Sequence, residues 1–227
     1  MKRRIIPVIL VFSFVCILSI SVMAEPSSLD KVKTWGDSVQ KYVTNPIEED
    51  TAVKQSLEVA KNNEIILPKV EIEQAKDFYI AAGYEEKEAS ELAVTYVKEI
   101  NTLYQEAIKN GYTVTEDEIS AYIEQMKKQF KSAENKEEIY NFINSFENED
   151  AYWKFQFEML KKDLPIQKYV SDKEKNFIDA SIPNNTSTRT IDNSEYADKI
   201  MEAQEKWIDE FENMKDTAES NYSYTVK

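Results

Sequence analysis

The sequence has no histidine, a single cysteine, three glycines and six prolines among its 227 residues. Without histidine there is no Ser–His pair and no imidazole general base. The one cysteine, Cys16, lies in an apolar run near the N-terminus, so the rest of the chain has no thiol nucleophile and no disulfide. Zinc, copper and haem lose their usual ligands together with these two residue types. The composition therefore favours a protein without catalysis, metal or cofactor.

The first 24 residues have the pattern of an export signal. Residues 2–4 are basic, residues 5–23 are mostly apolar, and Val22 and Ala24 are the small residues of a signal-peptidase site. We expect cleavage before Glu25 and an extracytoplasmic location, either secreted or at the outer face of the cytoplasmic membrane. The alternative is an uncleaved anchor, because the run approaches the ~18–20 residues that span a bilayer. Only such an anchor would give the protein contact with a membrane.

Acidic residues outnumber basic ones, 42 to 28, which gives a net charge of −14. Removal of residues 1–24 takes away three basic residues and no acidic one, so the charge of the mature chain becomes −17. Such a surface repels nucleic acid and anionic lipid, and it attracts basic segments of other chains. The simplest interpretation of the charge is a well-solvated surface.

The clearest local signal is a helix end followed at once by a helix start, at residues 111–119. Gly111 lacks a Cβ and suits the left-handed residue that closes a helix. Thr115 is the predicted N-cap of the next helix, and Glu118 completes a capping box with it. Apolar residues spaced three and four apart lie on both sides of this junction. We expect two amphipathic helices that form a hairpin and share a core.

The other segments also predict helices, so the fold class is all-α. Residues 25–47 resemble a linker with room for one short helix, and residues 48–227 form a helical domain. A helix from about Val70 closes at Gly83. Further helices begin near Asn135 and at Asn148.

The last third of the chain contains one predicted helix breaker and one polar loop. Pro165 should kink or end the helix that starts at Asn148. Residues 181–193 form the loop, and a long C-terminal helix follows over 194–219. Residues 65–67 are strand-like, while residues 222–226 form either a short terminal strand or a frayed tail.

Residues 103–169 resemble the N-terminal chaperone region of the SurA and PrsA extracytoplasmic foldases, and the helical domain of trigger factor has the same style. The resemblance is carried by residues 104–119, where a helix ends in Gly111 and a Val-Thr pair and acidic residues open the next. A second similarity is the helix start at residues 150–153. The resemblance implies a multi-helix chaperone domain closed by a C-terminal helix.

The sequence departs from these foldases in two ways. Only residues 171–193 lie where the family has a parvulin prolyl isomerase domain, and the parvulin histidines are absent. Isomerase activity is therefore not implied. The usual Val-Asn-Gly turn of the entry segment is also missing, with residues 62–65 in its place.

Aromatic residues gather over residues 140–157. They either line a groove that takes apolar segments of unfolded exported chains or form the core, where aromatics at helical spacing usually lie. Tyr140, Tyr152 and Phe155 are expected to reach the surface. Trp153 falls under both interpretations, as a client contact and as a core residue. Phe142, Phe146 and Phe157 are expected in the core.

Acidic residues at 147, 149 and 150 fit no calcium loop, and helix capping explains them better than acid–base chemistry. Three function classes remain after these exclusions. The sequence favours an exported, non-catalytic chaperone that binds unfolded polypeptides. The second class is an exported interaction or structural protein with one dedicated partner. The third is an enzyme that uses carboxylates alone, as glycosidases do.

Overall fold

The computed structural model describes residues 51–133, 136–182 and 193–227. The predicted signal, the linker, Asn135 and most of the polar loop lie outside these residues. The described chain is mostly helical with one two-stranded sheet, which confirms the all-α class. The helices are α3 (Thr51–Ser56), α4 (Lys69–Ala81), α5 (Glu86–Lys109), α6 (Glu116–Ser132), α7 (Lys136–Ile143), α8 (Glu149–Ser181) and α9 (Asn193–Ser220).

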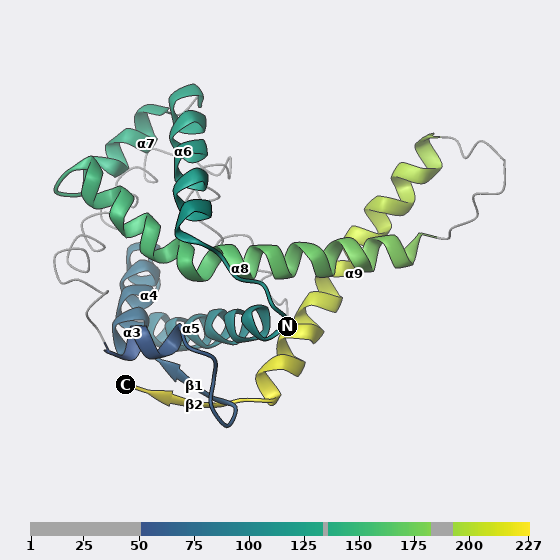
Figure 1. Ribbon diagram of the computed structural model, residues 1–227, viewed down its shortest axis with the longest axis horizontal. Helices are drawn as coiled ribbons and strands as arrows, with labels where there is room; N and C mark the ends of the chain where they lie inside the picture. The colour runs from purple at the N-terminus through teal and green to yellow at the C-terminus, as the bar shows by residue number, and fades with distance from the viewer. Residues whose placement is uncertain (1–50, 134–135, 183–192) are drawn as a thin grey trace.

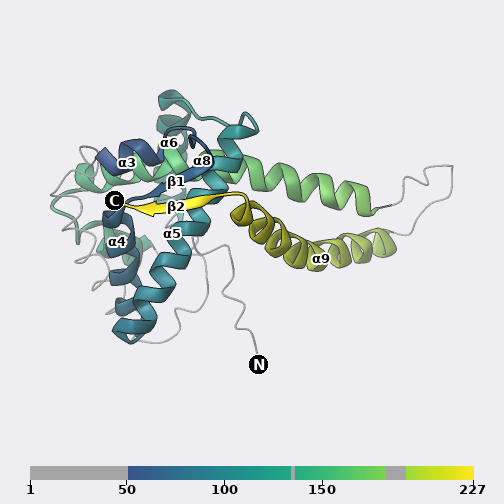
Figure 2. The ribbon, with the colours of Figure 1, turned by 90° about the horizontal axis from the view of Figure 1, so that it is seen from below.

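The sheet joins the two ends of the described chain. Strand β1 (Glu64–Leu67) pairs in parallel with strand β2 (Ser223–Val226). The strand-like run at residues 65–67 and the terminal segment are therefore partners, and the terminal strand is the alternative that the structure supports. The side chains of Ile65 and Leu67 are buried against α4 and α5. The sheet and helices α3, α4 and α5 form what we call the body (Figures 1 and 2).

Two further parts extend from the body. The lobe consists of α6, α7 and residues 149–164 of α8, and it has its own apolar core. The arm consists of residues 170–181 of α8 and the beginning of α9, which project together away from the body (Figures 1 and 2). Between them, α5, the middle of α8 and α9 share a third cluster around Ile166, Trp207 and Phe211. Helix α8 thus belongs to both the lobe and the arm.

Helices α5 and α6 do not form the predicted hairpin with a shared core. Helix α6 packs on α8 and α7, while α5 packs on α4, α8, α9 and β1. Helix α5 has two buried faces: Ala93 packs with β1 and α4, whereas Ile100 and Tyr104 pack with α8 and α9. The second half of α5, which leads to the connector, is almost wholly buried by these neighbours, and the apolar stripe of α6 instead meets the aromatic first half of α8.

Both predicted glycine caps have the expected backbone. Gly83 has φ +98° and Gly111 has φ +86°, in the region that favours glycine. After Gly111, the N–H of Tyr112 donates to the carbonyl of Ala107 at 3.0 Å, as in a Schellman motif. The same bond after Gly83 joins Tyr84 to Tyr79 at 3.1 Å.

Pro165 does not end α8, contrary to one of the two predicted outcomes. The helix continues for four turns beyond it, to Ser181, and Figure 1 shows that α8 changes direction along its length. Proline removes one backbone hydrogen bond from a helix interior. Residues 162–166 are all buried, so packing on several sides holds the helix together across this point. Within the described ranges, no helix is both long enough and apolar enough to cross a bilayer.

Candidate functional site

Two of the four predicted client-binding residues lie inside the lobe. Tyr152 is fully buried and touches Phe142, Phe146 and Trp153 edge to face. The expectation that Tyr152 reaches the surface is therefore wrong. Burial raises the pKa of its phenol well above the usual value. Trp153 is 8% exposed and belongs to the same core, and its indole N–H donates to Glu149 at 2.9 Å.

The other two, Tyr140 and Phe155, are half-buried at the edge of the lobe core. They belong to a set of half-buried aromatic residues from α6, α7 and α8, which we call the aromatic rim: Tyr122, Tyr140, Phe155 and Phe157. Phe155 packs on the buried Phe146 with ring centroids 5.8 Å apart. Each rim residue packs against the lobe core and is also partly accessible to solvent. The rim can therefore contact an apolar ligand without any rearrangement of the core.

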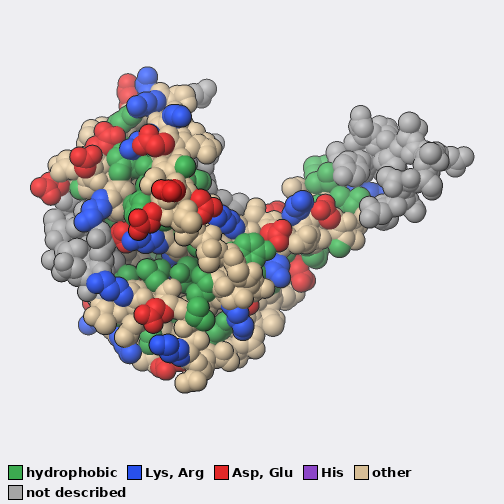
Figure 3. Space-filling model, in the orientation of Figure 1, with side chains coloured by type: hydrophobic (Ala, Val, Ile, Leu, Met, Phe, Trp, Pro, Cys, Tyr) green, Lys and Arg blue, Asp and Glu red, His purple; other side chains and the backbone are tan. Residues whose placement is uncertain are grey.

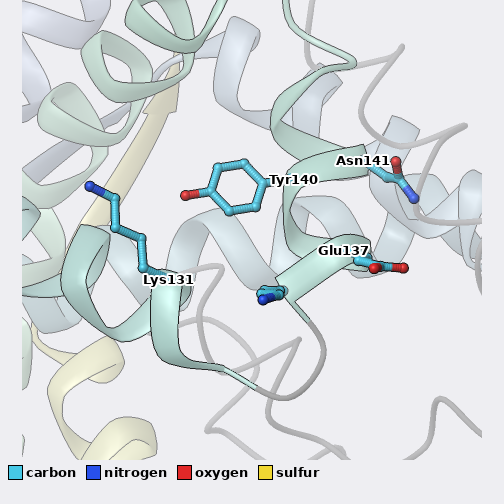
Figure 4. Close-up of a pocket in the computed structure, with 5 residues that line it drawn as sticks. Lys131, Glu137, Tyr140 and Asn141 are labelled. Atoms are coloured by element: carbon cyan, nitrogen blue, oxygen red, sulfur yellow. The ribbon is translucent and has the colours of Figure 1, made fainter.

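Tyr140 also lines an open pocket between the end of α6 and α7. The pocket is lined by Lys131, Lys136, Glu137, Tyr140 and Asn141. Figure 4 shows that the ring of Tyr140 spans the space between the two helices, toward Lys131, while Glu137 and Asn141 point the other way. An aromatic ring with two lysines at its border suits a short polypeptide stretch better than a small molecule, which binds in enclosed cavities.

The face of the molecule shown in Figure 3 carries apolar side chains in its middle. They gather between the lobe and the layer of α4 and α5, with charged side chains around them. The outline of the molecule is indented between the lobe and the arm (Figure 3). Exposed apolar surface of this kind usually marks a site of interaction with another molecule.

A buried polar cluster joins α3, α4, α5 and α8 at the centre of the body. The ammonium group of Lys162 donates to Glu71 at 2.7 Å, to Asn101 at 3.0 Å and to Ser56 at 3.2 Å. The amide of Asn101 in turn donates to Glu71 at 3.1 Å. All three N–H bonds of Lys162 are thereby used, so this amine is held as a donor and is not presented as a nucleophile or base.

A second group of charges lies where α9 crosses α5. Lys215 is 6% exposed and lies 3.0 Å from Glu212 and 3.6 Å from Glu99. Lys98 pairs with Glu219 at 2.6 Å. Burial raises the pKa of the Glu99 carboxyl, while Lys215 opposes that shift and Glu219 and Glu212 add to it. Two lysines and three glutamates thus pair across the packed interface of α5 and α9.

Metal ligation has no site in the described part of the chain. No group of three or more histidine, cysteine, aspartate or glutamate side chains is placed there to hold an ion. The aromatic rim and the apolar face are the described features that offer contact surface to another molecule.

The aromatic rim was only partly foreseen from the sequence. Tyr122 and Phe157 belong to it, although the sequence predicts Phe157 in the core and does not single out Tyr122. The polar cluster around Lys162 was not foreseen at all. Its members lie up to 106 positions apart in the sequence, and no local sequence motif links them.

No protein-family model, no curated protein and no solved structure matches this chain. The resemblance to the chaperone region of SurA and PrsA therefore stays a prediction.

Proposed function

We propose that the protein is an exported, non-catalytic, chaperone-like protein that binds unfolded or partly folded polypeptides and assists the folding of secreted clients. The observations that support this most are the apolar side chains gathered between the lobe and the layer of α4 and α5 (Figure 3), and the half-buried aromatic rim of the lobe. Export rests on the predicted signal segment. The resemblance to extracytoplasmic foldases gives the same function from independent residues.

Binding would work by burial of apolar client side chains against the aromatic rim. Aromatic rings provide a large contact area at a small cost in side-chain entropy. The net charge of the mature chain, −17, would draw basic client segments toward the protein and keep the complex in solution. Weak, multiple contacts of this kind allow release without an energy source.

The experiment is dilution of a chemically denatured, aggregation-prone protein into buffer with and without the purified protein, followed by light scattering. We expect suppression of aggregation at a molar excess of the protein. The double variant Tyr140→Ala/Phe155→Ala should suppress it less, because it removes two rim rings. The matched control is Tyr84→Ala, which removes a half-buried ring from the body.

Circular dichroism of each variant shows whether it is folded, so that a loss of binding can be distinguished from a loss of structure. No suppression by the unaltered protein at molar excess would exclude the proposal. Equal loss in the rim variant and in Tyr84→Ala would exclude the rim as the binding surface.

A second candidate function is binding of one dedicated partner, and helix α9 carries the observation that favours it. Met201 and Ile208 are 54% and 47% exposed and lie two turns apart on one flank of α9. Such a pair is typical of a seam for a partner helix. A pull-down that gives one stoichiometric partner, lost in Met201→Lys/Ile208→Lys, would select this function over general polypeptide binding.

A further inference from the structure

Helix α9 has one side that is buried and one side that carries exposed apolar residues. Trp207 and Phe211 are buried against residues of α5 and α8. Met201 and Ile208, seven residues apart and therefore on one side of the helix, are instead 54% and 47% exposed. Among the exposed large apolar side chains of the described chain, only these two belong to the same helix or strand. They therefore offer apolar contact at helical spacing, which isolated exposed side chains do not.

Two glutamates complete this side of the helix. Glu205 lies four residues after Met201 and three before Ile208, and Glu212 lies four residues after Ile208, so that the four side chains form one line. We call this line the α9 seam: Met201, Glu205, Ile208 and Glu212. Glu205 is exposed, and it takes part in no ion pair within the described part of the chain. The side chain of Glu212 is 50% exposed, and its ion-pair partner is Lys215 at 3.0 Å.

The same line of α9 already receives a helix farther along. Seven residues after Glu212, Glu219 pairs with Lys98 of α5 at 2.6 Å. Lys215, beside this line, lies 3.6 Å from Glu99 of α5. Helix α5 therefore covers the C-terminal part of the line, with a lysine placed against a glutamate. Figures 1 and 2 show that the beginning of α9 projects away from the body that contains α5, so the line continues without that cover.

The charge of α9 indicates which kind of helix fits the seam. Residues 193–220 include nine acidic and three basic side chains, which gives a net charge of −6. Asp209 and Asp216 are exposed on the flank of the seam. Pairing of the seam with its own copy would bring these carboxylates face to face, and like charges repel. An amphipathic helix with lysine or arginine beside its apolar stripe instead complements both the apolar pair and the carboxylates.

We propose that the α9 seam docks a basic amphipathic helix of a partner protein. Apolar side chains of that helix lie against Met201 and Ile208, and its lysine or arginine side chains pair with Glu205 and Glu212. The pair of Lys98 and Glu219 is the pattern that the partner helix repeats. This inference rests on the second candidate function, binding of a dedicated partner, and names the chemistry of that partner. The seam belongs to α9 alone and shares no residue with the aromatic rim.

The test is fluorescence anisotropy of a labelled peptide of about 18 residues, or about five helical turns, titrated with the purified protein. Its leucines follow the 3-4 spacing of an amphipathic helix, and every other position is lysine. One control peptide has glutamate in place of each lysine. A second control has leucine and lysine in strict alternation, which gives no apolar helical face. We expect the first peptide to bind at least about tenfold more tightly than either control. No binding of the first peptide, or equal binding of a control, would overturn the inference.

A pair of double variants locates the peptide on the seam. Met201→Lys/Ile208→Lys removes the apolar pair and should weaken binding at least about tenfold. The matched control is Val59→Lys/Val94→Lys, which replaces two exposed apolar side chains elsewhere and changes the net charge by the same amount. This control should bind the peptide within about threefold of the unaltered protein. Equal loss of binding in the two double variants would overturn the inference.

A single charge reversal tests the acidic part of the seam and leaves the apolar pair in place. Glu205→Lys should weaken peptide binding about fivefold at low salt, and less at high salt, because salt screens exposed charges. The matched control is Glu91→Lys, a reversal of an exposed carboxylate on α5, which should change binding less than about twofold. Undiminished binding by Glu205→Lys would overturn the inference. Circular dichroism checks the fold of each variant, and if Met201→Lys/Ile208→Lys does not fold, Glu205→Lys decides.

The outcomes separate this inference from the functions proposed above. One stoichiometric partner that Met201→Lys/Ile208→Lys still retains would leave the dedicated-partner function standing and overturn the seam. Peptide binding at the seam without suppression of aggregation would support the seam and exclude the chaperone function. Sedimentation of the protein without peptide supplies a further outcome. A dimer that Met201→Lys/Ile208→Lys dissociates would show that a second copy occupies the seam, and would overturn the assignment of a basic partner helix.

Discussion

The ammonium group of Lys168, on α8, lies 2.7 Å from the carboxylate of Glu118, the residue that closes the capping box of α6. The same ammonium donates to the carbonyl oxygen of Thr113 at 2.9 Å. One lysine therefore holds both the connector after α5 and the first turn of α6. This contact explains how α6 keeps a fixed direction although it does not pack along α5.

The first prediction concerns the titration of Glu118. The hydrogen bond from Lys168, followed by that from the Thr115 backbone, lowers the pKa of Glu118 to about 2. A carboxyl with a lowered pKa in the folded state stabilises the fold above its unfolded pKa, and this contribution is lost as the pH falls toward 2. Lys168→Met should raise the pKa of Glu118 toward its usual value, as measured by NMR titration. Lys175→Met, a change of an exposed lysine on the same helix, should leave it unchanged.

The second prediction concerns the backbone at Gly111. Its φ is +86°, and a Cβ at this position would meet nothing within 4 Å, so the cost of a side chain is one of conformation alone. Gly111→Ala should lower the free energy of unfolding by about 1–2 kcal/mol. Gly111→Asn should cost less, because asparagine tolerates this region better. Urea unfolding of both variants measures the difference, and equal stability of Ala and Gly would contradict it.

The third prediction concerns the polar cluster of the body. Lys162→Met leaves the Glu71 carboxylate, whose side chain is 21% exposed, without its cation. Loss of one partner of a buried pair typically costs 3–5 kcal/mol, and partial exposure of Glu71 places this case at about 3 kcal/mol. The double variant Lys162→Met/Glu71→Leu should recover most of that loss. Lys206→Met, in an ion pair whose side chains are 63% and 64% exposed, is the control and should change stability by less than about 0.5 kcal/mol.

The fourth prediction concerns Glu99 at the crossing of α5 and α9. Burial raises the pKa of Glu99 in the folded state, so the fold binds this proton more tightly than the unfolded chain does. Its contribution to stability is therefore most favourable at acidic pH and declines as the pH rises through the folded pKa. Glu99→Gln is neutral at every pH. At about pH 7.5 it should melt at a higher temperature than the unaltered protein, and below about pH 4 the two melting temperatures should differ little. A lower melting temperature at neutral pH would show that the pair with Lys215 dominates.

Local features of this chain could be predicted from the sequence because their causes are local. The caps at Gly83, Gly111 and Thr115 depend on residues within one helical turn, and the structure has all three. The C-terminal helix, expected over 194–219, is α9, Asn193–Ser220. Stripes of apolar residues likewise indicated where helices lie.

The partners of those helices could not be predicted in the same way. An apolar stripe shows that a helix has a buried face, but not which helix covers it. Helix α5 also buries Asn101, Thr102 and Gln105, polar residues that helical periodicity assigns to solvent. Their burial depends on acceptors and donors contributed by distant segments, such as the Ser56 and Glu58 carbonyls that accept from Gln105. The surface position predicted for Tyr152 was wrong for a related reason. The lobe covers α8 on several sides, whereas a single apolar stripe predicts only one buried face.

The parallel pairing of β1 with β2 joins residues about 160 positions apart, as the bond between Ser223 and Asn63 illustrates. Contacts of such long sequence separation form slowly, because a large loop must close first. During synthesis, β1 leaves the ribosome long before β2 has been made. The sheet of the body can therefore form only after β2 has emerged. Closure of the body therefore depends on β2, and a chain that lacks residues 223–226 should form its helices without closing the body.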